Sequence, residues 1–240
     1  MIEVGHLTQQ FGRVTALRDV SFHIGRGETV ALIGPSGAGK TTLLRVLSTY
    51  IAPTAGSVTV GGHDVVTESL KVRRIMGYLP EKDPIYPEMR VMEYLTFRVR
   101  LRGLSGRTRT KRLRELIGRC GLAGLERAIM GNLSKGEVRR VLLADCLAAE
   151  PEVILLDEPT LGLDPINTDR LRGLFTQLKA ERTVVFTTHD MAEAESLASR
   201  VMVLKRGAMT ALATPQALMR ERGVTSLAAV LKAEVAGGAA

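Results

Sequence analysis

The segment GPSGAGKT, residues 34–41, places three glycines ahead of a lysine and a threonine. Glycines let the backbone take positive φ and approach an anion closely, so that successive N–H groups converge on it where a helix begins. A lysine at this spacing reaches the β- and γ-phosphates of a nucleotide, and the next hydroxyl is placed to ligand Mg²⁺. The segment therefore predicts a nucleoside triphosphate site. The binding residues that we expect are Gly34, Pro35, Ser36, Gly37, Ala38, Gly39, Lys40, Thr41 and Thr42, with Thr41 also on the metal.

Two adjacent acids, Asp157 and Glu158, follow the apolar run of residues 153–156. A run of that length is typical of a buried strand, and we expect it to lie beside the strand that precedes the glycine-rich loop. A carboxylate in that position can hold Mg²⁺, and a second one can polarise an attacking water. Adjacent acids alone also fit a solvated strand end, but the upstream loop favours a metal role for Asp157 and a water-activating role for Glu158.

Apolar strands that alternate with helices predict an α/β fold around a parallel or mixed sheet. The first 33 residues have the pattern of short strands, and the middle of the chain changes to a helical, Arg- and Leu-rich composition. We therefore expect one domain over 1–240, with a core from 1–83 and 150–222, a helical insertion over 84–149, and a short C-terminal element with a frayed tail over 223–240. The strands expected are 20–24, 29–33, 57–60, 153–156, 183–186 and 201–204, and the helices 39–50, 167–180 and 215–221.

The composition indicates which class of protein this chain belongs to and which partners it favours. The chain has 240 residues, of which 45% are hydrophobic, so it can form an ordinary core and is not globally disordered. No apolar run approaches the roughly 18 residues of a membrane helix, and the N-terminus lacks the pattern of a secretory signal. A net charge of +8 favours anionic partners. The basic run over 98–114 fits a solvated helix face or a surface for lipid headgroups or a partner, and Cys120 and Cys146 fit reduced, partly buried thiols.

Five further motifs resemble those of the ABC-type ATPases, in the same order, and the resemblance extends from Ile2 to about Glu221. Residues 132–140, NLSKGEVRR, resemble the family's signature and place Ser134 23 residues before Asp157. Each residue alone has a plainer role, such as a helix cap for Ser134 or a core position for Phe11, but order and spacing favour the family. The other motifs are Phe11 with Gly12 for adenine stacking, a Q-loop over 77–81, a D-loop over 162–164 and an H-loop over 187–190.

The resemblance implies a P-loop ATPase with an N-terminal antiparallel β subdomain and an inserted helical subdomain. It implies ATP and Mg²⁺ as ligands, with Glu158 as general base and His189 holding the γ-phosphate and orienting the water. Two subunits, most simply identical ones, are expected to face head to tail around two ATP molecules. The nucleotide-contacting residues that it adds are Phe11, Ser134, Lys135, Gly136 and Asp164, and Glu81 is a further candidate metal ligand.

Three positions depart from the commonest family pattern. Lys135 stands where Gly is usual, Glu137 where Gln is usual, and Glu81 where the Q-loop usually has Gln. An ionised Glu81 can ligand a metal but cannot donate a hydrogen bond as an amide does. The Leu-Pro-Glu and Ser-Lys-Gly variants, the run 192–195 and the segment 226–231 resemble ATPase subunits that export drugs, polysaccharides or lipids.

A family member without a membrane span is expected to work through a separate membrane permease, at the inner face of the cell membrane on the cytoplasmic side. We expect the permease to bind the apolar residues Pro84, Ile85, Tyr86, Pro87, Met89 and Met92, although these could instead pack internally. Two alternatives stay open. The first is a soluble ABC-type ATPase acting on nucleic acid or ribosomes, which the 4% aromatic content disfavours. The second is a nucleotide-binding subunit with little turnover, suggested by Glu81 and Glu137.

Overall fold

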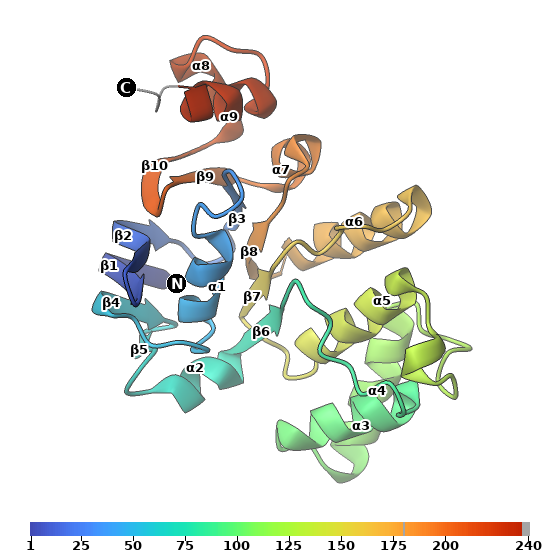
Figure 1. Ribbon diagram of the computed structural model, residues 1–240. Coiled ribbons are helices and arrows are strands. Elements are labelled where there is room, and N and C mark those ends of the chain that lie inside the picture. The colour runs from blue at the N-terminus through green and yellow to red at the C-terminus, as the bar shows by residue number, and fades with distance from the viewer. Residues whose placement is uncertain (180, 237–240) are drawn as a thin grey trace.

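The computed structural model describes residues 1–179 and 181–236, and its strands form two sheets (Figure 1). The central sheet has the strand order β10-β9-β3-β8-β7-β6, and the second sheet has the order β2-β1-β4-β5. The strands are β1 (Ile2–Phe11), β2 (Val14–Ile24), β3 (Thr29–Ile33), β4 (Ala55–Val60), β5 (His63–Asp64), β6 (Met76–Leu79), β7 (Val153–Leu156), β8 (Thr183–Thr187), β9 (Arg200–Lys205) and β10 (Ala208–Ala213).

The central sheet is mixed, as expected. Its strands from β9 to β6 are mutually parallel, and β10 returns antiparallel beside β9. Every residue of β3, β7 and β8 is buried, because both faces of the sheet are covered. One expectation is wrong: β7 does not lie beside β3, because β8 pairs with both and separates them. The loop after β3 and the acids after β7 are therefore bridged by the end of β8.

The second sheet is antiparallel and corrects the prediction of short strands before residue 33. β1 and β2 are 10 and 11 residues long and form one hairpin. Their pairing shifts register between Val4 and Gln10, and His6 and Asp19 there adopt positive φ. These irregularities break the alternation of apolar and polar residues, so the pattern looked like several short strands.

Most helices follow the expected positions. The expected helix 39–50 ends earlier, at Leu47, and Thr49 has a φ of 61° that no helix tolerates. The C-terminal segment forms a helix from Leu227 to Ala236, whereas residue 180 and the expected frayed tail 237–240 lie outside the described residues. The helices are α1 (Lys40–Leu47), α2 (Ser69–Ile75), α3 (Val91–Leu101), α4 (Gly106–Arg119), α5 (Lys135–Cys146), α6 (Pro165–Lys179), α7 (Met191–Leu197), α8 (Pro215–Glu221) and α9 (Leu227–Ala236).

Two apolar layers hold the central sheet between them. Alternate residues of β3 point to opposite faces: Val30 and Leu32 pack with α1 and the antiparallel sheet, and Ala31 and Ile33 pack with the other helices. Figure 1 shows the same division, with β1, β2, β4 and α1 to one side and α5 and α6 to the other. The sheet therefore serves as a rigid platform whose carboxyl edge carries the loops described below.

The basic run over 98–114 is only partly a solvated face. Arg98 and Arg102 of the α3 region both bind the carboxylate of Asp145, which is 6% exposed, at 2.8 and 2.5 Å. Arg112 of α4 bonds the carbonyl of Ala148 at 3.1 Å and the carboxylate of Glu150. Arg98 and Arg102 fasten the α3 region to α5, because a buried carboxylate such as that of Asp145 needs charged or hydrogen-bonding partners. Arg112 fastens α4 to the segment that follows α5. The thiols of Cys120 and Cys146 are fully buried, deeper than expected.

The apolar segment that we expected to receive a permease divides between two environments. Ile85, Met89 and Met92 pack against the helical core, as in the alternative of internal packing. Tyr86 stays 42% exposed, with its ring 5.9 Å from that of Phe97. Among the described residues, no helix combines the length and the apolar character needed to cross a membrane.

Candidate functional site

The glycine-rich loop connects β3 to α1, at the carboxyl edge of the central sheet. Gly39 has a φ of 106°, and a Cβ there would lie 2.6 Å from the carbonyl oxygen of Ala16, so the position admits only glycine. The Lys40 side chain is 7% exposed, and its ammonium donates to the carbonyl of Gly34 at 2.8 Å and that of Pro35 at 3.3 Å. Burial lowers the pKa of Lys40, against the opposing charges of Glu158, Asp157 and Glu81.

Asp157 lies at the end of β7 and fits a metal ligand. Its Oδ1 accepts from the hydroxyl of Thr187 at 2.7 Å and from that of Thr41 at 3.3 Å. Its Oδ2 is buried, with no hydrogen-bond partner in the described part of the chain. Burial raises the pKa of this carboxyl. A buried carboxylate oxygen without a partner, beside a threonine hydroxyl, is the kind of hard oxygen donor set that Mg²⁺ prefers, so Asp157 and Thr41 fit the metal.

Glu158 is 7% exposed and adopts the left-handed conformation, with a φ of 47°. Its N–H donates to the hydroxyl of Thr187 at 2.8 Å, which stabilises that conformation. Its Oε1 lies 3.3 Å from Nε2 of His189 without hydrogen-bond geometry. Burial raises the pKa of Glu158 to about 7, although the charge of Lys40 opposes the rise. A carboxylate with that pKa is suited to take a proton near neutral pH.

Five of the expected residues thus come together: Lys40, Thr41, Asp157, Glu158 and His189, which we call the strand-end cluster. The imidazole of His189 is half exposed. Burial and the charge of Lys40 lower its pKa, so it is mainly neutral at pH 7. The cluster pairs a buried carboxylate with a histidine at the same edge that carries the glycine-rich loop of residues 34–41, which is the expected phosphate loop. This arrangement can bind a triphosphate and activate a water beside it.

The Q-loop follows β6 and reaches the cluster less directly. Glu81 is exposed, and it acts on Lys40 through its charge. The backbone of this loop is held by Arg139 of α5, which is 1% exposed and donates to the carbonyl of Pro80 at 2.8 Å and to that of Glu81. Asp83 lies 3.3 Å from the same guanidinium. Arg139 therefore fastens the Q-loop to the helix that begins at the signature.

The signature lies with the D-loop rather than with the glycine-rich loop. A Cβ at Gly136 would lie 2.4 Å from the Asn167 side chain, and one at Gly162 would lie 2.5 Å from Nζ of Lys135. Asp164 caps α6 by accepting from the Asn167 N–H at 3.0 Å. Ser134, Lys135 and Asp164 are exposed. We call Ser134, Lys135, Gly136, Gly162 and Asp164 the signature surface.

Phe11 lies at the tip of the β1–β2 hairpin, 49% exposed, where it pairs with Val14 across the turn. The next residues of β2 run back to the phosphate loop, because the Ala16 carbonyl lies against Gly39. The role of Phe11 in adenine stacking stays a prediction.

Sequence reasoning assigned no role to three residues that the structure places in or beside the site. Thr187 bridges Asp157 and the Glu158 backbone, Thr188 bonds to the side chain of Glu193, and Arg139 holds the Q-loop. The two threonines immediately before His189 were visible as part of the H-loop. Their roles depend on β8 lying between β3 and β7, which the linear pattern did not show.

Known proteins share both the sequence and the fold. The profile of the ABC transporter family matches residues 17–161. The sulfate/thiosulfate import ATP-binding protein CysA of Xanthomonas campestris is 40% identical, over 89% of this chain and 64% of its own length. The linearmycin resistance ATP-binding protein LnrL of Bacillus subtilis is 30% identical, over 93% of this chain and 72% of its own length. The chain spans 60% of the length of a second CysA, from Rhizobium meliloti, so it is shorter than these relatives.

Solved structures agree with this assignment. The ATP-binding subunit of an ABC transporter superposes with a TM-score of 0.87 and 30% identity, over 96% of this chain and 97% of the other. The dimeric ATP-binding cassette MJ0796, in a post-hydrolysis state bound to ADP and Pi, gives a TM-score of 0.81 and 28% identity, over 89% and 98%. The resemblance inferred from the motifs is confirmed: the chain belongs to the ABC transporter family and carries its ATP-binding cassette, the ATPase domain.

Proposed function

We propose that this chain hydrolyses ATP to drive a membrane permease that exports its substrate. The observation that carries the hydrolytic part is the strand-end cluster, in which Glu158, with a pKa of about 7, lies 3.3 Å from His189 beside the phosphate loop. In the proposed reaction, the carboxylate of Glu158 accepts a proton from the water that attacks the γ-phosphate, while the bond from the γ-phosphorus to the β–γ bridging oxygen breaks and ADP leaves. His189 orients that water and the γ-phosphate.

Lys40, Thr41 and Asp157 bind the triphosphate and its metal in this proposal. The Lys40 ammonium, now shared between two loop carbonyls, is positioned to transfer to phosphate oxygens, which carry more negative charge. Thr41 and Asp157 would hold Mg²⁺, which supplies positive charge to the phosphates when bound. Glu81 contributes a negative charge nearby and is retained as a candidate metal ligand. Phe11 would stack on the adenine ring.

Completion of the site in this proposal requires a second copy of the chain. Within the signature surface, Ser134, Lys135 and Asp164 are exposed, whereas Gly136 is buried against Asn167 of α6. The exposed residues are free to face the phosphate loop of a partner. The dimeric structures of MJ0796 support this arrangement. In the dimer, Ser134, Lys135 and Gly136 would contact the γ-phosphate bound to the other subunit, and Asp164 would lie near the interface. The helical unit of residues 84–149 would carry the signature toward that nucleotide.

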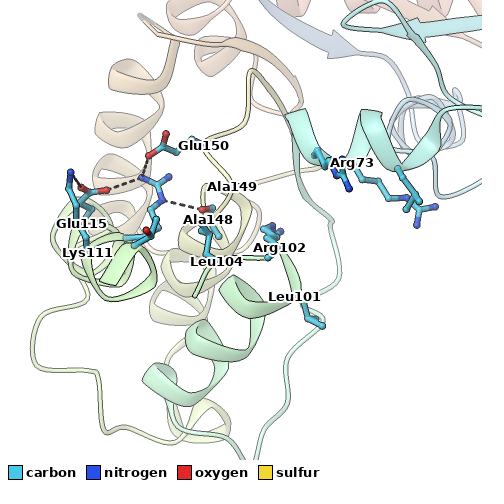
Figure 2. Close-up of a pocket in the computed structure, with 14 residues that line it drawn as sticks. Arg73, Leu101, Arg102, Leu104, Lys111, Glu115, Ala148, Ala149 and Glu150 are labelled. Atoms are coloured by element: carbon cyan, nitrogen blue, oxygen red, sulfur yellow. Dashed lines mark hydrogen bonds and ion pairs between the residues drawn. The ribbon is translucent and has the colours of Figure 1, made fainter. Parts of the chain in front are cut away.

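We propose that the permease binds a groove between α2 and the α3–α4 region (Figure 2). This proposal replaces the expected segment over 84–92, because none of its residues lines the groove. Its volume is about 720 Å³, and Leu70, Leu101 and Leu104 line it. Arg73 stands on the α2 side in Figure 2, opposite Leu101, and Lys111 lies across the groove on α4.

Glu115 and Glu150 also line the groove and pair with the basic residues of α4, so among the described residues its free positive charge lies on the α2 side, at Arg73 and Arg74. An amphipathic permease helix with an acidic end directed toward α2 fits this arrangement. Binding there would place the chain on the cytoplasmic face of the membrane.

The export direction rests on the Q-loop, signature and post-His189 variants of this chain, and on LnrL, whose name marks a resistance protein. Relatives at 37–40% identity include sulfate/thiosulfate import proteins, so sequence identity alone does not favour export.

Purification of the tagged chain from its own membranes in mild detergent tests the assembly with a permease. Stoichiometric recovery of a multi-spanning protein supports it, and recovery with ribosomes or nucleic acid contradicts it. Inverted vesicles that accumulate substrate with external ATP would then establish export.

A further inference from the structure

A buried carboxylate lies behind the histidine loop. Glu193, in the first turn of α7, is 1% exposed, although glutamate is rarely buried without a partner. The sequence pattern assigns no role to Glu193, although residues 192–195 resemble a subgroup of the family. Its surroundings show what it does in the fold.

One oxygen of Glu193 joins the two segments that flank the catalytic pair. Oε2 accepts from the hydroxyl of Thr188 at 2.6 Å and from the hydroxyl of Thr160 at 3.3 Å. Thr188 immediately precedes His189, and Thr160 comes two residues after Glu158. The carboxylate therefore fixes the separation between the backbone that carries the base and the backbone that carries the histidine.

The other oxygen faces a guanidinium that is also incompletely bonded. Oε1 of Glu193 and Nε of Arg172 are both buried without a hydrogen bond among the described residues, and they lie 3.5 Å apart. The terminal nitrogen of Arg172 binds the Asp190 carboxylate at 2.5 Å. Arg172 belongs to α6, which begins directly after the D-loop residue Asp164. A small shift of α6 would turn this contact into a charge-assisted hydrogen bond.

We propose that Glu193 is a positioning residue for ATP hydrolysis, which holds His189 against Glu158 and links both to the D-loop helix through Arg172. This inference rests on the proposed roles of Glu158 and His189. Displacement of a catalytic group by about 1 Å can lower a rate about 100-fold, so the hydroxyl contacts of one buried oxygen are enough to matter. Because Glu193 is buried and its carboxylate bonds to the hydroxyls of Thr188 and Thr160, its loss is expected to affect turnover and not ATP binding.

The test compares steady-state ATPase kinetics of the full chain and four variants, with Mg²⁺ present. Glu193→Ala is expected to lower kcat about 10-fold or more and to change KM for ATP by less than about twofold. Thr188→Val keeps the shape of the side chain but removes the 2.6 Å hydrogen bond, and a similar loss is expected. In the double variant Thr188→Val/Glu193→Ala the losses should not add, because both remove one interaction. Glu193→Gln keeps an acceptor for the hydroxyls but loses the charge facing Arg172, so we expect a smaller loss.

Glu195→Gln is the matched control, because Glu195 lies on the same helix but its carboxylate binds the N–H of Leu227. Thermal unfolding is measured for every variant. If Glu193→Ala fails to fold, Thr188→Val and Glu193→Gln decide. Wild-type kcat in these variants, with Glu158→Gln inactive, overturns the positioning role and leaves the proposed hydrolysis intact. A normally active Glu158→Gln overturns the proposed hydrolysis itself.

Discussion

Directly after β7, Asp157 and Glu158 are buried, and each keeps one buried oxygen without a hydrogen-bond partner among the described residues. By contrast, the exposed Ser134, which caps α5, has its bonds satisfied by the first turn of that helix. The Ser134 N–H and hydroxyl both donate to the Glu137 carboxylate at 2.8 Å. These bonds lower the pKa of Glu137. Buried unsatisfied oxygens indicate a ligand that completes the group. A satisfied exposed cap indicates a surface that a partner must rearrange before it can bind a phosphate.

The first prediction tests the catalytic role of the strand-end cluster. Glu158→Gln removes the base and is expected to lower kcat about 1,000-fold, within the range for general-base removal. ATP binding should persist, because the phosphate loop is unchanged, and the variant should accumulate as an ATP-bound dimer. Phosphate release and light scattering measure the two effects. Glu152→Gln, in the loop at the opposite end of β7, is the control. Normal turnover in Glu158→Gln would mean that another residue is the base.

The second prediction concerns the charge that the phosphate loop holds. Lys40→Ala removes a partly desolvated ammonium and should weaken ATP affinity by about 2 kcal/mol, or roughly 30-fold. Equilibrium binding of a fluorescent ATP analogue measures it. Lys71→Ala is the control, since Lys71 is exposed and paired with Glu68. Unchanged affinity in Lys40→Ala would contradict the assignment of the phosphate loop.

The third prediction follows from the raised pKa of Glu158, which lies at about 7. The proposed base works when ionised, so kcat should fall about tenfold per pH unit below 7. A raised folded-state pKa also means that the native state binds the proton more tightly than the unfolded state does. The stability from the protonated form is therefore lost as pH rises from about 4.5 through 7.

Unfolding by urea at pH 5 and pH 8 measures that stability effect. The free energy of unfolding of Glu158→Gln, relative to that of the wild type, should be about 2 kcal/mol higher at pH 8 than at pH 5, after allowance for partial solvent access. An equal difference at both pH values would show that the Glu158 pKa is not raised.

The smallest expected effect concerns the charge of Glu137 beside the signature surface. Glu137→Gln keeps a side-chain acceptor at the cap but removes a negative charge from the surface that faces the partner's γ-phosphate in the proposed dimer. ATP-dependent dimerisation should strengthen about threefold, as expected for one exposed charge. Sedimentation with ATP in the Glu158→Gln background measures it. Glu93→Gln is the control, because Glu93 closes the equivalent cap of α3. Weaker dimerisation in Glu137→Gln would indicate that the carboxylate supports the interface.

The α/β class, the buried strands and the glycine-rich loop between a strand and a helix could be predicted from the sequence, because these follow from local patterns. Residues 29–33 and 153–156 are continuous apolar runs that end at chemically distinctive residues, and each strand was found with its bounds correct. The family followed from the order of short motifs. The long hairpin of β1 and β2 escaped prediction, because bulges disrupt the period-2 pattern.

Tertiary structure alone decided how the motifs meet. The insertion of β8 between β3 and β7 gives Thr187 its bridge between Asp157 and Glu158, and no local pattern fixes strand order. Burial is likewise a property of the assembled fold: it raises the pKa of Glu158 and leaves Glu193 facing Arg172. Sequence therefore specified which chemical groups are present, and packing set their separations and their protonation.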